Sequence, residues 1–202
     1  MEQRVRVIDL FAGCGGFSVG FEQAGYEITK AVEFDKAIAM SYSINHLNTI
    51  VYAEDIGTIV DNDHFNFNEA EVIIGGPPCQ SWSEGGTRRG IDDPRGQLFH
   101  EYIRILSATQ PMFFVAENVS GMLASRHRNA VAAFLESFRN AGQHGYDVRL
   151  QMLNARDYQV PEDRDRVFYV GFRRDLNIYD YDYPTPIAER LTLRDAIWDL
   201  QD

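Results

Sequence analysis

The amino-acid sequence predicts an α/β fold in which helices cover a doubly wound, mostly parallel sheet. Over residues 1–172, short runs rich in β-branched side chains alternate with amphipathic stretches, as they do in consecutive parallel βα units. Several of these runs are apolar throughout, which is typical of strands buried on both faces. A length of 202 residues and a hydrophobic content of 45% fit one domain of this kind.

Seven strands are expected from the apolar and β-branched runs. They cover residues 4–10, 28–33, 49–53, 72–75, 112–116, 147–153 and 167–172. Between and after them, apolar side chains recur every three or four residues, which predicts helices with one apolar face each. The residues of these faces are Phe17, Gly20, Phe21 and Ala24; Leu98, Tyr102, Ile105 and Leu106; Val131, Phe134, Leu135 and Phe138; and Leu193, Ala196, Ile197 and Leu200.

The sequence changes character after Phe172, where alternating Tyr and Asp residues lead into two prolines. We therefore expect one domain over residues 1–174 and a tail over residues 175–202. Thr192 and Asp195 predict a capping box at the start of the last helix. This helical pattern reaches the final residue without a Gly or Pro stop signal, so we expect the architecture to continue beyond it.

Composition argues against several classes of protein. No apolar run approaches the ~20 residues that cross a bilayer, and no signal peptide precedes the first strand, so we expect a soluble, cytoplasmic chain. The two cysteines, Cys14 and Cys79, and five histidines show no ligand spacing, so neither a disulfide framework nor a metal site is expected. A net charge of -11 argues, taken alone, against a surface that binds nucleic-acid phosphates.

A glycine-rich turn over residues 13–16 follows the first predicted strand and begins the first helix. Such a turn lets a ligand approach the backbone, although Ser18 stands where a dinucleotide-binding turn has its third glycine. Glu33 and Asp55 close the next two strands. Carboxylates suit a ribose, an adenine amino group or an ammonium better than a phosphate, so this pattern favours S-adenosylmethionine over NAD. A tight turn without a ligand is the alternative.

A long loop over residues 75–96 is rich in Gly, Pro, Ser and Arg and lacks periodicity, which is typical of a functional loop. Pro77 and Pro78 fix the backbone before Cys79 at the carboxyl end of a strand, where open α/β sheets carry their active sites. This position favours a reactive thiol over a small buried side chain. For Cys14, inside the glycine turn, a structural role is favoured.

Three charged residues follow or precede other predicted strands. Glu117 comes directly after the strand 112–116, where burial would raise its pKa toward the range of a proton donor. Arg164 and Arg166 precede the strand 167–172, and alternation along an extended segment would point both side chains to one side. An N-cap or a surface acid for Glu117 and a solvated ion-pair surface for the arginines are the alternatives.

The order and spacing of these motifs resemble those of the DNA (cytosine-5) methyltransferase family. The motifs are residues 9–16, 33–35, 76–80, 117–119 and 164–166. The run over residues 75–96 is most similar to bacterial restriction-modification enzymes of the HaeIII type. The resemblance covers essentially the whole chain. It implies a Rossmann-like methyltransferase fold, with residues 1–174 as the cofactor-binding and catalytic domain. It also implies that the protein acts in the cytoplasm of a prokaryotic cell.

The resemblance implies that S-adenosylmethionine is the cofactor and S-adenosylhomocysteine its product. The implied cofactor-binding residues are Phe11, Ala12, Gly13, Gly15, Gly16, Glu33, Phe34, Asp55, Ile56, Pro78 and Leu98. Within this set, Glu33 would bind the ribose hydroxyls and Asp55 the adenine amino group. Phe11 would stack on the adenine, although its pattern alone favours a core residue.

The resemblance also implies the catalytic groups. Cys79 would add to C6 of a flipped cytosine, Glu117 would engage N3, and Arg164 would contact O2, with Arg166 in the same set. The loop would close over double-stranded DNA. The implied DNA contacts are Gln80, Ser81, Ser83, Arg95 and Asn118.

Several positions depart from the family pattern. Glu162 stands where Gln is usual, Gln159 where Gly is common, and Glu54 where Gly precedes the adenine-binding Asp. Nothing in the chain matches the family's C-terminal target-recognition part. We therefore expect a C-terminal segment or a second chain as partner, without which this acidic chain would be inactive. The alternatives are a tRNA-directed member of the same family and a cofactor-binding module without turnover.

Overall fold

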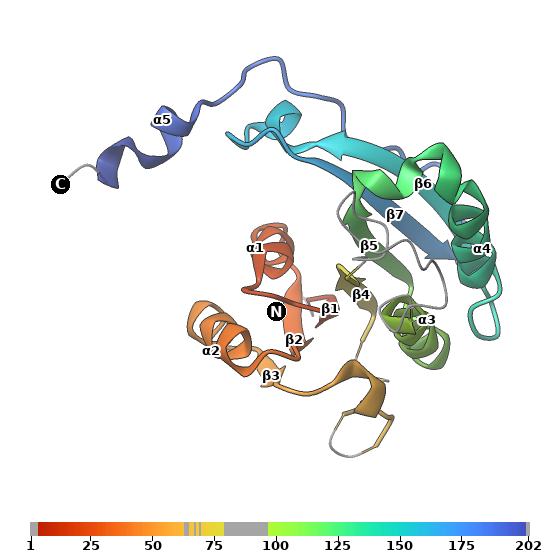
Figure 1. The fold of residues 1–202 in the computed structure, drawn as a ribbon. Coiled ribbons are helices and arrows are strands. Elements are labelled where there is room, and N and C mark those ends of the chain that lie inside the picture. Colours follow the sequence, from red (N-terminus) through yellow and green to blue (C-terminus); the bar gives the residue numbers. More distant parts are fainter. Residues whose placement is uncertain (1–3, 63–64, 67, 69, 79–96, 201–202) are drawn as a thin grey trace.

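The computed structural model describes residues 4–62, 65, 66, 68, 70–78 and 97–200, which form a seven-stranded sheet with helices on both faces (Figure 1). The strands are β1 (Arg6–Leu10), β2 (Glu27–Val32), β3 (Ile50–Tyr52), β4 (Val72–Gly75), β5 (Phe113–Val119), β6 (Tyr146–Asn154) and β7 (Asp165–Arg173). The strand order is β3-β2-β1-β4-β5-β7-β6. All seven expected strands are present, with ends that differ by a few residues.

The sheet is parallel from β3 to β5, and β7 is antiparallel to both β5 and β6. The prediction of a doubly wound, mostly parallel sheet is therefore confirmed. The strand order reverses at β1, which lies between β2 and β4. Open α/β sheets bind their ligands at the carboxyl ends of the strands beside such a reversal.

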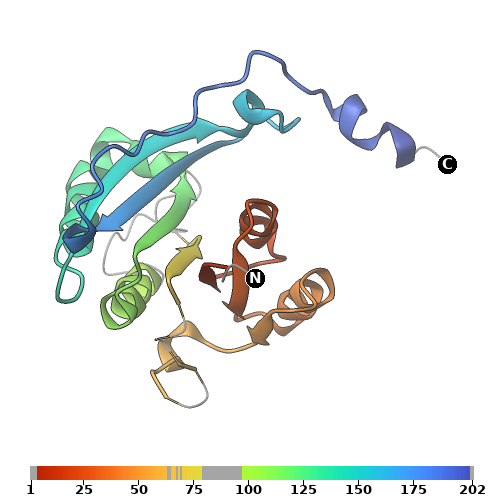
Figure 2. The same ribbon diagram turned by 180° about the vertical axis from the view of Figure 1, so that it is seen from behind.

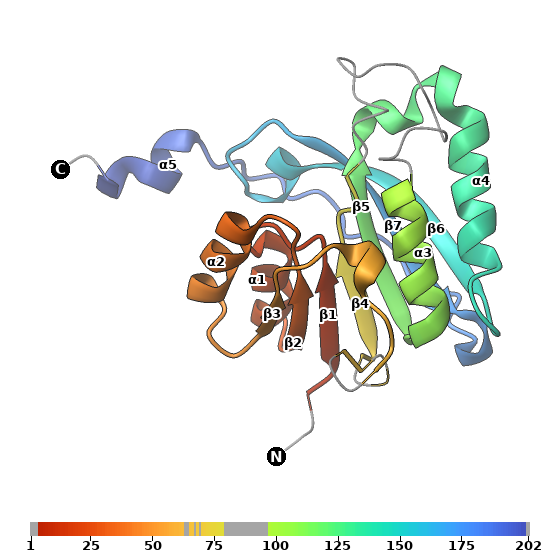
Figure 3. The ribbon, with the colours of Figure 1, turned by 60° about the horizontal axis from the view of Figure 1, so that its bottom comes forward.

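The helices are α1 (Gly16–Gln23), α2 (Lys36–Asn45), α3 (Gln97–Thr109), α4 (Arg128–Arg139) and α5 (Leu193–Ile197). Figure 3 shows α3 and α4 along one face of the sheet, and α1 and α2 lie on the other. The apolar pattern of the sequence did not predict α2, because only Ala39 and Tyr42 of this helix are buried. Its sequence signal is the N-cap Asp35, whose carboxylate accepts hydrogen bonds from two backbone amides.

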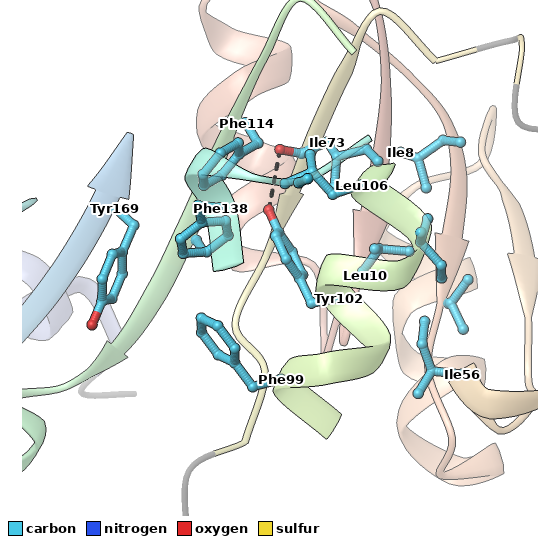
Figure 4. Packing of buried hydrophobic residues seen from close by; sticks show 14 of the residues in the cluster. Ile8, Leu10, Ile56, Ile73, Phe99, Tyr102, Leu106, Phe114, Phe138 and Tyr169 are labelled. Carbon is cyan, nitrogen blue, oxygen red and sulfur yellow. Dashed lines mark hydrogen bonds between the residues drawn. The ribbon is translucent and has the colours of Figure 1, made fainter. Parts of the chain in front are cut away.

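The core has two layers because successive strand residues point to opposite faces. Ile8, Leu10 and Ile73 pack toward α3 and α4, whereas Val7 and Val72 pack toward α1. Aromatic rings fill the layer under α3 and α4, where the residues in contact are Phe99, Tyr102, Phe114, Phe138 and Tyr169 (Figure 4). This packing fixes α3 against strands β5 and β7.

The tail crosses β6 and β7 and then leaves the body of the molecule (Figure 2). The Tyr183 hydroxyl donates to the Phe168 carbonyl at 2.8 Å, which holds the tail on the sheet. The expected capping box is present, with Thr192 and Asp195 each accepting from the other's backbone. Beyond Tyr183, residues 184–200 are exposed. Within the described part of the chain, no helix is both long and apolar enough to cross a membrane.

Candidate active site

A cavity of about 640 Å³ opens at the carboxyl ends of β1, β4 and β5, between the start of α1 and the strands β6 and β7. One wall belongs to the glycine turn, and the opposite wall carries the charged residues predicted for catalysis. Six of the predicted site residues line this cavity together: Phe11, Ala12, Gly16, Glu117, Arg164 and Arg166. The cavity therefore joins the predicted cofactor site to the predicted catalytic groups.

The glycine turn depends on positive backbone φ angles. Gly13 has a φ of 56° and Gly15 a φ of 94°, and Phe11 also lies in this region at 58°. A Cβ atom on Gly15 would lie 2.0 Å from Nε2 of His46, whose side chain is fully buried. Gly15 is thus required both by conformation and by the approach of His46.

Glu33 ties the end of β2 to the glycine turn. Its Oε2 atom accepts a hydrogen bond from the Gly13 amide at 3.0 Å, and its Oε1 atom accepts one from the Asp35 amide at 2.9 Å. The neighbouring Phe34 side chain is 71% exposed, an unusual position for an aromatic ring. Glu33 and Phe34 do not line the cavity described above and lie on its β2 side.

The other predicted cofactor residues occupy adjacent strand ends. Asp55 is exposed and follows β3, where its Oδ1 atom accepts from the Gly57 amide at 2.9 Å. Ile56 is buried in the core, and Leu98 at the start of α3 packs against the same core. Pro78 follows β4 and is half-buried. These residues surround the β1 reversal, although the structure does not gather them in one cavity.

A chain of buried polar side chains, which the sequence motifs did not predict, lies beneath the glycine turn. Asp9 is 1% exposed and lines the cavity, and the Ser18 hydroxyl donates to its carboxylate at 2.7 Å. The Tyr42 hydroxyl lies 2.6 Å from Ser18 and donates to it, since the Ser18 proton is already engaged. Burial raises the pKa of Asp9 to about 7, and the nearby Glu33 charge adds to this effect. The sequence feature that could have indicated this chain is an Asp within an otherwise apolar strand.

Glu117 lies near the end of β5 and faces the cavity. Burial raises its pKa above the ordinary value although Arg166 and Arg164 oppose this shift, so the predicted direction is confirmed. The Arg166 Nε atom lies 2.6 Å from the Glu117 Oε1 atom. A Cβ on Gly76 would be 3.3 Å from the Oε2 atom, so the glycine keeps the space before this oxygen open.

Arg164 and Arg166 both line the cavity, as the alternation of an extended segment predicts. Arg164 forms an ion pair with Glu162 at 3.3 Å. Glu162 is one of the residues that depart from the family pattern. A second departure, Gln159, has a φ of 61°, the left-handed conformation that glycine adopts without cost. Gln159 therefore keeps the turn that a glycine would form and accepts strain to do so.

Asn118 was predicted to contact DNA, and the structure buries it to 3% exposure. Its Nδ2 atom donates to the Pro77 carbonyl at 3.2 Å, so it holds the backbone that leads to residue 79. The other predicted DNA contacts and the nucleophile lie outside the described residues. They are Gln80, Ser81, Ser83, Arg95 and Cys79. Among the described residues, no cluster of His, Cys, Asp and Glu could hold a metal ion.

The family model for C-5 cytosine-specific DNA methylases matches residues 5–202. The chain belongs to this family. It is 52% identical over 202 residues to the Type II methyltransferase M.NgoPII of Neisseria gonorrhoeae, covering 98% of this methylase chain and 58% of the relative. It is 51% identical to M.FnuDI of Fusobacterium nucleatum, covering 98% of this chain and 56% of that protein. The methylase chain thus spans a little over half the length of these relatives.

Solved structures support the same fold. A DNA modification methyltransferase encoded within an E. coli prophage superimposes with a TM-score of 0.77 at 32% identity, covering 96% of this chain and 54% of that one. The S. pombe Dnmt2 methyltransferase has a TM-score of 0.63 at 19% identity, covering 89% of this chain and 51% of that one, and shows a shared fold alone.

Proposed function

We propose that this methylase chain is the cofactor-binding and catalytic part of a restriction-modification DNA (cytosine-5) methyltransferase. The reaction moves a methyl group from S-adenosylmethionine to C5 of a cytosine flipped out of duplex DNA. The observation that carries the proposal is the cavity that places Glu117 and Arg166 opposite the glycine turn. An acid opposite the glycine turn, the proposed cofactor-binding segment, supports this function in a chain of the cytosine methylase family.

The chemistry needs a nucleophile and a group that stabilises charge on the base. The Cys79 thiolate adds to C6, C5 then takes the methyl group from the sulfonium, and loss of the C5 proton expels the thiolate. The Oε2 atom of Glu117 lies on the open Gly76 side and engages N3, because Oε1 is held by Arg166. Because its pKa is raised, the Glu117 carboxyl group keeps its proton to a higher pH than the carboxyl group of an exposed Glu does.

The residues at the ends of β1, β2 and β3 fit S-adenosylmethionine, which supplies the electrophilic methyl group when bound. The Glu33 carboxylate, already aligned by two backbone amides, suits vicinal ribose hydroxyls. The exposed ring of Phe34 offers a stacking surface, and the exposed Asp55 carboxylate suits an amino group. Gly16 lines the cavity from the turn and would flank the methionine part, and Phe11, which lines the same cavity, would stack on the adenine.

We infer that a further polypeptide segment, in this chain or another, covers a second, apolar groove and contributes target recognition. This groove of about 540 Å³ lies between α1 and the uncovered faces of β5 and β7. Its aromatic lining consists of Phe17, Phe21, Tyr26, Phe113, Phe172 and Tyr181. The relative M.NgoPII is long enough to supply such a segment, since this chain matches only 58% of it. Helices cover the opposite face of the same strands.

Covalent trapping tests the proposal. A duplex that contains 5-fluorocytosine cannot lose a C5 proton, so the adduct through Cys79 should accumulate when the C-terminal half of a relative is supplied. Cys79→Ser should abolish the adduct while S-adenosylmethionine still binds, because a hydroxyl is a far poorer nucleophile at neutral pH. Cys14→Ser, at an exposed position in the glycine turn, is the matched control and should still form the adduct.

Two results would contradict the proposal. Cofactor binding without any adduct or methyl transfer would indicate a binding module. Methyl transfer to tRNA in preference to the duplex would indicate the tRNA-directed branch of the family.

A further inference from the structure

The segment that follows β3 makes a short, well-bonded loop over residues 55–59. The Asp55 carboxylate accepts from the Gly57 amide at 2.9 Å, and its carbonyl accepts from the Thr58 amide at 2.9 Å. Ile56 and Ile59 anchor the loop in the core with exposures of 4% and 1%. The Asp55 side chain therefore has its direction set by a single turn of 3-10 helix, Ile56–Thr58.

Arg104 of α3 closes this turn from outside. Its Nη2 atom donates to the Ile56 carbonyl at 3.0 Å and to the Ile59 carbonyl at 2.8 Å. Its Nε atom donates to the Glu101 carboxylate at 2.7 Å, one helical turn earlier. The guanidinium is thus oriented by its own helix and bonded to carbonyls that lie 45 and 48 residues away in the chain.

These contacts differ from those of an ordinary surface ion pair. Arg139 and Glu136 have the same spacing on α4, but they lie 3.8 Å apart with side chains that are 52% and 63% exposed. An exposed ion pair of this kind contributes little to the stability of the fold. Arg104 instead satisfies carbonyl groups at the end of a helical turn, where bonds from the charged guanidinium are stronger than neutral ones.

We propose that Arg104 is a positioning residue for the cofactor: by holding the 55–59 loop it directs the Asp55 carboxylate toward the adenine amino group. This inference rests on the proposed function, in which Asp55 recognises that amino group. Lysine would replace Arg104 only in part, because its three N–H donors share one nitrogen, whereas Arg104 reaches Glu101 through Nε and the two carbonyls through Nη2. Leu98, another of the proposed cofactor-binding residues, lies in the first turn of the same helix, so α3 would support the cofactor site at two positions.

Ligand discrimination provides the first test. Calorimetry on the full 202-residue chain compares S-adenosylhomocysteine with S-inosylhomocysteine, in which an oxo group replaces the amino group. The wild type should prefer the adenine form about tenfold or more, the effect of one lost hydrogen bond with a charged acceptor. Arg104→Ala should reduce this preference to nearly one, and Arg104→Lys should fall between. Arg139→Ala is the matched control and should keep the full preference.

Amide exchange provides the second test and needs no ligand. Exchange at residues 56–59 should be about tenfold or more faster in Arg104→Ala, and should be unchanged in Arg139→Ala. If Arg104→Ala does not fold, Glu101→Gln, which removes only the orienting charge, should show a smaller change in the same direction.

The two tests separate failure of this inference from failure of the proposed function. A wild-type chain with no preference for adenine would contradict the role of Asp55, and the exchange data would then decide the role of Arg104. Unchanged exchange in Arg104→Ala would overturn the inference. So would a retained adenine preference in that variant.

Discussion

Asp9 is a carboxylic acid whose surroundings oppose its ionisation. Its side chain is 1% exposed at the base of the cavity, and its partners are the hydroxyl of Ser18 and, through it, that of Tyr42. Glu33 is the nearby like charge. The Ser18 hydrogen bond favours the ionised form, but burial outweighs it, so the pKa rises from 3.8 to about 7.

Replacement of Asp9 by Asn should change how stability depends on pH. The folded wild type binds this proton more tightly than the unfolded chain, so its contribution is complete below pH 4 and is lost as pH rises to about 7. Relative to Asp9→Asn, the wild type should lose at most about 4 kcal/mol of unfolding free energy over this interval. Denaturant unfolding of both proteins at pH 4.5 and pH 8 checks this, and parallel curves would contradict it.

Among the secondary-structure elements, the start of α1 depends most on one contact. Gly15 precedes the helix with a positive φ, and His46 from the end of α2 fills the space beside it. The His46 ring cannot move aside easily, because Glu22 bonds its Nδ1 atom at 3.1 Å and the tilted Tyr42 ring packs against it with the ring centroids 4.3 Å apart. The glycine turn and α2 are therefore packed as one unit.

We expect Gly15→Ala to lower the free energy of unfolding by about 2–4 kcal/mol, because the methyl group adds left-handed strain to a clash with His46. Gly20→Ala, inside α1 with no atom within 4 Å of the new methyl group, should instead stabilise the protein by about 0.5–1 kcal/mol. Urea unfolding of the three proteins measures both effects. Equal effects of the two substitutions would show that the His46 contact does not constrain the turn.

At the scale of the whole molecule, the two faces of the sheet are covered unequally. Strands β5 and β7 pack under α3 and α4 on one face, and on the other they contribute Phe113 and Phe172 to an apolar groove beside α1. The tail adds Tyr181 at the margin. Apolar surface of this kind is generally covered by another polypeptide in a functional protein.

The C-terminal half of a relative, added as a separate chain, should therefore bind this groove and generate methyl transfer that neither part shows alone. Phe21→Gln should weaken this association about tenfold or more, because a buried aromatic ring contributes several kcal/mol to an interface. Ile44→Gln on the exposed side of α2, outside the groove lining, is the control. Sedimentation and transfer assays measure both. Methyl transfer by the 202-residue chain that is unaffected by the added half would contradict the proposal.

Local sequence patterns were enough to predict the strands, most of the helices and the strand ends at which charged residues lie. These features follow from local patterns: a buried strand is read from its apolar run, and the residue after it lies at the sheet edge. Glu117 illustrates this, because its position after an apolar run also predicted the burial that raises its pKa. The family motifs then supplied roles that spacing alone left open.

Which distant residues come into contact depends on the tertiary fold. The antiparallel β7 lies between β5 and β6, and its register brings Arg166 to Glu117 although 49 residues separate them. Arg104 and Asn118 bond to backbone carbonyls of distant segments, and no local pattern records such partners. Helix α2 contributes too few buried residues to show a clear period. The physical reason is common to all of these: strand pairing and cross-chain hydrogen bonds are fixed by global packing, which periodicity in one segment does not encode.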